Sequence, residues 1–246
     1  MSGSLRHDAE PAALPAAAPA SGPRAAGDAT ARAVWAVLRK ECRSEWRTRY
    51  GLNAALLFAV TTLTAVSFAV GRLTDRTDLL AALLWVVLLF AALSSLAHTF
   101  VREVEGRTDT LLRLVASPTA IAFGKLLFNL LFLVVIEIVT VPLFLVLMGA
   151  PAPAWGPFLA LLALGSLALG GAATLVGAVI AQTRGRGALF AGASLPVLLP
   201  VLAAAVSGTK ALWAGGSPAA ELRLLATYAI AVLAVSLLLY DHLWED

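Results

Sequence analysis

The feature that most constrains this chain is the segment 126–183, in which Glu137 is the only ionisable residue. Across all 246 residues, 60% are hydrophobic and 13% are charged, whereas soluble domains carry about 25% charged residues. A segment with such side chains is stable in the lipid core of a membrane, where a helix pairs its own backbone N–H and C=O groups. The sequence therefore predicts an all-α integral membrane protein.

Six segments approach the length of about 20 residues that a helix needs to cross a bilayer. We expect six transmembrane helices preceded by one interfacial amphipathic helix, all within residues 32–246. Residues 1–31 are rich in alanine and proline and predict a disordered tail, because such a segment buries little apolar surface. The expected spans are about 52–70, 79–100, 126–148, 155–182, 187–206 and 222–240.

The segment 32–50 predicts the amphipathic helix. Its spacing of three and four residues places one apolar set on a single helix face, and basic residues cover the remainder. Such a helix lies in the headgroup plane with its basic face toward lipid phosphates. The apolar set is Trp35, Leu38, Cys42 and Trp46, and the basic set includes Arg39, Lys40, Arg43 and Arg47.

Basic residues near the span ends predict the orientation. They concentrate in the amphipathic helix, in residues 101–125 and in the turn at Arg184 and Arg186. The positive-inside rule then places the N-terminus, the segment 101–125 and the C-terminus in the cytoplasm.

Residues 101–125, called the polar stretch below, separate two long apolar spans. Its charges alternate in sign, its centre is a short aliphatic run, and a Ser-Pro pair ends that run, because the residue before proline avoids the helical region. An ordinary solvated loop has no need of the aliphatic residues, so we favour a docking helix for another protein. These features comprise Glu103, Glu105, Arg107, Asp109, Leu111, Leu112, Arg113, Leu114, Val115, Ser117 and Pro118.

Inside the predicted spans, Glu137 is the most unusual residue. A carboxylate at mid-bilayer costs on the order of 2.5 kcal/mol or more, so it requires a cavity, a partner or a proton. Two interpretations remain open: Glu137 lines a substrate path or interface, or it forms a hydrogen bond with Asn129, a threonine or a serine nearby. Pro196 and Pro200 each remove a backbone donor and predict a bent or broken fifth span.

The sequence contains no catalytic constellation and no GxxxxGK[ST] phosphate-binding loop. Its three histidines are His7, His98 and His242, and its one cysteine is Cys42, so we expect neither a metal site nor a directly bound cofactor. No basic-aromatic platform indicates nucleic acid. An intramembrane enzyme using Glu137 and a purely structural scaffold are the alternatives of other classes.

The basic helix, the six spans and the pattern ExEGxxxxLL…SP…GK in the polar stretch resemble the permease subunits of ABC exporters. Within these, the segments VWAVLRKECRSEW, TRGRGALF and LPVLLPVL resemble the CcmB family of haem exporter permeases, which serve cytochrome c maturation in the bacterial inner membrane. The resemblance implies that the stretch seats in a cytoplasmic ATPase, through Glu103, Glu105, Gly106, Leu111, Leu112, Ser117, Pro118 and Lys125.

The same resemblance implies partners and cargo. The partners are a CcmA-like ATPase that binds ATP, a second copy of this chain, haem-handling membrane subunits and membrane lipid. The function implied is haem export or ATP-driven release of a haem-loaded chaperone. A permease for another substrate, such as a drug or a lipid, is the alternative.

Overall fold

The computed structural model describes residues 23–106, 118–181 and 186–242, and all regular structure in these ranges is helical. Each helix after residue 49 follows from an apolar segment bounded by glycine, proline or charged residues, which end helices or mark the edge of the hydrocarbon. The helices are α1 (Pro23–Thr48), α2 (Tyr50–Val70), α3 (Thr77–Gly106), α5 (Pro118–Met148), α6 (Trp155–Ala181), α7 (Arg186–Trp213) and α8 (Ala219–His242).

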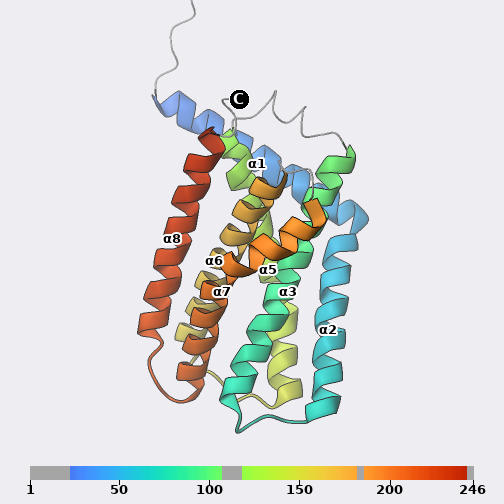
Figure 1. Ribbon diagram of the computed structural model, residues 1–246, viewed down its shortest axis with the longest axis vertical. Helices are drawn as coiled ribbons and strands as arrows, with labels where there is room; N and C mark the ends of the chain where they lie inside the picture. The colour runs from blue at the N-terminus through green and yellow to red at the C-terminus, as the bar shows by residue number, and fades with distance from the viewer. Residues whose placement is uncertain (1–22, 107–117, 182–185, 243–246) are drawn as a thin grey trace, which may run out of the picture.

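The helix α1 lies across one end of a bundle formed by the other described helices (Figure 1). The C-terminal ends of α3, α6 and α8 and the N-terminal ends of α5 and α7 lie at this same end of the bundle. The short connections α2–α3, α5–α6 and α7–α8 lie at the opposite end. Which of the two ends of the bundle faces the cytoplasm stays a prediction.

Five of the described helices are long and apolar enough to cross a membrane, and α3 adds a shorter apolar helix over Thr77–Ala91. The prediction of an all-α membrane protein is confirmed, while the count of six spans stays a prediction. Several helices extend beyond the expected bounds: α1 begins at Pro23, within the segment expected to be a tail, α3 ends at Gly106, α5 begins at Pro118 and α7 ends at Trp213. Proline is well suited to the first turn of a helix, which explains the early start of α5.

The centre of the bundle is α6. In its apolar window 67% of the residues are buried, against 17% in α2 and in α8. A Cβ atom added at Gly165 would overlap Cη2 of the fully buried Trp85 of α3. The indole Nε1–H of Trp85 donates to Thr209 Oγ1 of α7 at 2.8 Å. Gly165 therefore makes room for an indole that joins three helices.

The helix α7 is continuous through Pro196 and Pro200 but bent, so its N-terminal part leans across the bundle (Figure 1). A proline within a helix removes one backbone donor and kinks the axis. The hydroxyl of Tyr228, on α8, donates to the carbonyl oxygen of Val197 within the bent region. The expectation of a bent or broken fifth span is thus met by a bend, and α8 donates a hydrogen bond to the backbone within it.

Candidate functional site

Part of the predicted docking surface falls at two helix ends. Glu103, Glu105 and Gly106 form the last turn of α3, and Pro118 is the first residue of α5, at the α1 end of the bundle. The docking role therefore stays a prediction. The other residues named for docking lie outside the described residues: Arg107, Asp109, Leu111, Leu112, Arg113, Leu114, Val115 and Ser117.

The last residues of the polar stretch are not a surface segment but part of α5. A Cβ atom added at Gly124 would lie 2.6 Å from Cβ and Cγ1 of Val37, so α1 packs directly on this glycine. The side chain of Lys125 is also buried. Direct contact of Lys125 with a docked ATPase, which the resemblance implies, does not fit this burial. The sequence assigned Gly124 and Lys125 to the polar stretch because glycine and lysine interrupt the apolar run.

The faces of α1 differ from the predicted ones. Val37, Leu38 and Glu41 are buried, and the protein-facing stripe runs through them. Trp35 and Trp46, predicted to share a face with Leu38, are 65% and 75% exposed. Tryptophan is favoured at membrane interfaces, where the ring meets apolar chains and the N–H meets water. The helical spacing does not distinguish such an interfacial tryptophan from a residue that packs on the protein.

Cys42 lies beside the buried stripe of α1 and is partly buried. Burial, together with the neighbouring carboxylate of Glu41, raises the pKa of the Cys42 thiol. Glu41 itself forms an ion pair with Lys40 at 2.9 Å. A thiol with a raised pKa is a poor nucleophile, which agrees with a packing role.

A carboxylate fixes the corner between α1 and α2. Glu45 Oε1 accepts a hydrogen bond of 2.8 Å from the backbone N–H of Leu52, in the first turn of α2. Between the helices Arg49 adopts a left-handed conformation with φ of 52°. Its guanidinium carbon lies 5.1 Å from the centroid of the Trp46 ring. This corner was missed from sequence, because Glu45 belongs to the preceding helix, whereas the usual capping residues lie at the helix start or in its first turn.

Glu137 is buried and accepts a hydrogen bond from the hydroxyl of Ser166 on α6. Of the two interpretations left open for Glu137, the structure shows the hydrogen bond with a serine of a neighbouring helix. Asn129 does not contact Glu137: its Nδ2 donates to Thr174 Oγ1 at 2.9 Å. Thr174 in turn donates to the carbonyl of Gly170 at 2.6 Å. Glu137, Asn129, Ser166 and Thr174 are called the polar seam below.

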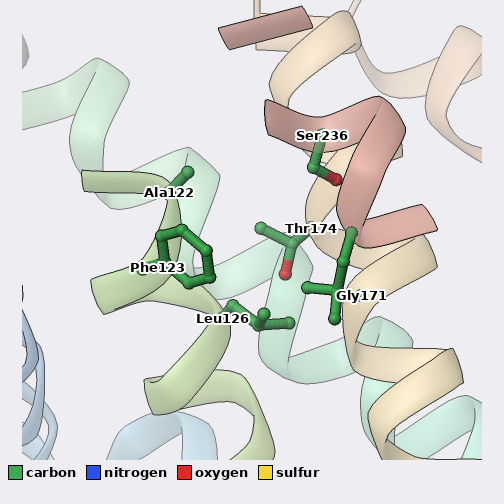
Figure 2. A pocket seen from close by; sticks show the side chains of 7 residues that line it. Ala122, Phe123, Leu126, Gly171, Thr174 and Ser236 are labelled. Atoms are coloured by element: carbon green, nitrogen blue, oxygen red, sulfur yellow. The ribbon is translucent and has the colours of Figure 1, made fainter. Parts of the chain in front are cut away.

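A small cavity of about 20 Å³ lies between α5, α6 and α8, beside the polar seam. Figure 2 shows Phe123 and Leu126 of α5 on one side and Ser236 of α8 on the other, with Thr174 between them. Its lining is largely apolar, and the volume suffices for about one water molecule. Among the described residues no group of three or more His, Cys, Asp and Glu could hold a metal ion.

Comparison with known proteins places these features in a family. A model of the CcmB protein family matches residues 32–242, which includes every helix described here from the middle of α1 onward. The chain is also 30% identical over 203 residues to a Paracoccus denitrificans (strain Pd 1222) protein named heme exporter protein B. That match covers 82% of this chain and 93% of the relative.

Proposed function

Because this chain belongs to the CcmB family, we propose that it is the membrane permease subunit of an ABC exporter for cytochrome c biogenesis. The observation that carries the proposal is the family match over residues 32–242, together with a relative named heme exporter protein B. The apolar helices of the bundle supply the membrane part of such a machine. The protein itself catalyses no reaction in this proposal.

The energy comes from a separate ATPase subunit that docks on the polar stretch. Two features support this: the sequence has no phosphate-binding loop of its own, and the described ends of the stretch, in α3 and α5, lie at the end of the bundle crossed by α1. The ATPase contacts the charged and aliphatic residues between Glu103 and Pro118. Two permease and two ATPase subunits form the complex, in a bacterial inner membrane with both termini cytoplasmic.

The cargo is haem, or a haem-loaded chaperone released by ATP-driven motion, and haem-handling membrane subunits complete the machinery. A permease for a drug or a lipid has the same architecture, so the cargo requires its own experiment.

Holocytochrome c in cells tests the proposal. In a strain lacking this chain, covalently bound haem detected by peroxidase staining is expected to disappear and to return with the wild-type chain. Leu112→Asp is expected to leave the chain in the membrane but lower holocytochrome c at least about tenfold, because a charge disrupts an apolar docking contact. The control Leu57→Ala, on an exposed lipid-facing position of α2, restores normal levels. Normal holocytochrome c without this chain would contradict the proposal.

A further inference from the structure

The contacts between α5 and α6 repeat at four-residue steps along both helices. Glu137 meets Ser166, and Asn129 meets Thr174. Between these pairs, a Cβ atom added at Gly170 would lie 3.7 Å from Cδ1 of Leu133. From one contact to the next, the residue number falls by four on α5 and rises by four on α6. The polar seam therefore defines one antiparallel register.

A shift by one turn, about 5.4 Å, would break both hydrogen bonds and offer no replacement. In one direction the partners of Glu137 and Asn129 would become Gly170 and Ala178. In the other direction they would become Leu162 and Gly170. None of these residue types has a polar side chain. Since an unpaired polar group in hydrocarbon costs several kcal/mol, sliding of α5 along α6 is strongly disfavoured.

The position of α5 makes this register important. Its N-terminus, Pro118, lies within the polar stretch, directly after the aliphatic run, so α5 receives any displacement produced there. The central helix α6, with 67% of its apolar window buried, packs against α3, α7 and α8 as well as α5. A displacement of α5 that is passed to α6 without sliding therefore reaches most of the bundle.

We propose that Glu137 and Asn129 are positioning residues that lock α5 to α6, so that both helices move as one body during the transport cycle. The inference rests on the proposed function for the source of the motion, but the lock itself is a property of this chain. The contact between α5 and α8 differs, because a small cavity beside Phe123 and Leu126 lies within it (Figure 2). Movement is expected at that contact and not at the polar seam.

Distances between spin labels test the lock in the full-length chain. Nitroxides are attached at Val146→Cys and Leu159→Cys, which are exposed positions on α5 and α6, in a Cys42→Ser background. A second pair, Val146→Cys with Ile230→Cys, reports on α5 against α8. Electron paramagnetic resonance in nanodiscs then gives the distance distribution of each pair.

In the isolated chain the α5–α6 distribution is expected to be narrow. Glu137→Leu combined with Asn129→Leu removes both polar partners and is expected to broaden it by about one helical turn, on the order of 5 Å. Glu137→Gln keeps an oxygen that accepts the Ser166 hydroxyl and is expected to retain the narrow distribution. If the double variant does not elute as folded protein, Ser166→Ala replaces it, with a smaller broadening expected. An unchanged distribution in the leucine or alanine variant overturns the lock.

In the complex with the ATPase, addition of a non-hydrolysable ATP analogue is expected to leave the α5–α6 distance unchanged while the α5–α8 distance changes. A change of about one turn between α5 and α6 overturns the inference. Holocytochrome c is expected to fall at least about fivefold with the leucine variants and not with Glu137→Gln. If no ATPase associates with the chain, the proposed function fails, whereas the measurement on the isolated chain still decides whether the lock exists.

Discussion

The helices α2 and α6 are both apolar enough to cross a membrane, yet 17% of the α2 window is buried against 67% of the α6 window. The difference lies in which side chains the two helices carry. Gly165, Gly170 and Gly171 of α6 let neighbouring helices approach closely, whereas α2 presents Leu57 and Phe68 to lipid. Because lipid is as apolar as leucine, hydrophobicity does not select the central helix; small residues and polar pairs do.

The largest effect is expected at Gly165. In Gly165→Ala the new Cβ atom would overlap the Trp85 ring, so the helices must separate. Overpacking of this kind costs about 1–3 kcal/mol, which we expect as a loss of free energy of unfolding in detergent. The matched control is Gly156→Ala on the same helix, where the added atom meets nothing within 4 Å. Equal stability of the two variants would contradict the role assigned to Gly165.

A smaller loss is expected for Trp85→Phe, which removes the hydrogen bond to Thr209 and leaves a void beside Gly165. Loss of one buried hydrogen bond costs about 1 kcal/mol. The phenylalanine lacks the ring atoms that would clash with an alanine at position 165. The double variant is therefore expected to be more stable than the sum of the single losses predicts, measured as a double-mutant cycle. Strict additivity would argue against their contact.

Removing the carboxylate at the corner between α1 and α2 is expected to lower the free energy of unfolding by about 1 kcal/mol, the usual cost of removing a capping group. Glu45→Ala leaves the Leu52 N–H without its carboxylate acceptor, and amide hydrogen exchange at the start of α2 is expected to accelerate. Glu45→Gln retains an acceptor oxygen and serves as the control. Unchanged exchange in Glu45→Ala would show that the carboxylate does not hold the corner.

The smallest effect is expected on the lipid-facing side of α2. Leu57→Ala replaces an exposed side chain, and we expect a change in free energy of unfolding below about 0.5 kcal/mol. The thermal midpoint in detergent measures it against the wild-type chain. A loss as large as that of Gly165→Ala would mean that α2 packs against a further partner at this face.

The sequence predicted the elements that depend on long apolar runs and on charge. It did so because a lipid-soluble segment has few structures available to it. It predicted that Glu137 must have a partner or a cavity, and a serine of the next predicted span is that partner. It also indicated a bent or broken fifth span from Pro196 and Pro200.

What the sequence did not predict depends on how the helices face one another. Gly165 and Trp85 lie far apart in the chain, so their contact has no local signal. Trp35 and Trp46 fit the helical spacing of a packing face but are exposed at the bundle end. Gly124 and Lys125 were grouped with the polar stretch because their residue types are polar or helix-breaking, while both lie in α5, where Gly124 packs against Val37.

The central claim, that a separate ATPase drives this permease through the polar stretch, is tested most directly by co-purification. The tagged full-length chain is expected to retain the ATPase subunit of its own organism in a stoichiometric complex. Leu112→Asp is expected to lose it, and Leu57→Ala to keep it. Retention of the ATPase with undiminished ATP hydrolysis in Leu112→Asp would contradict the claim.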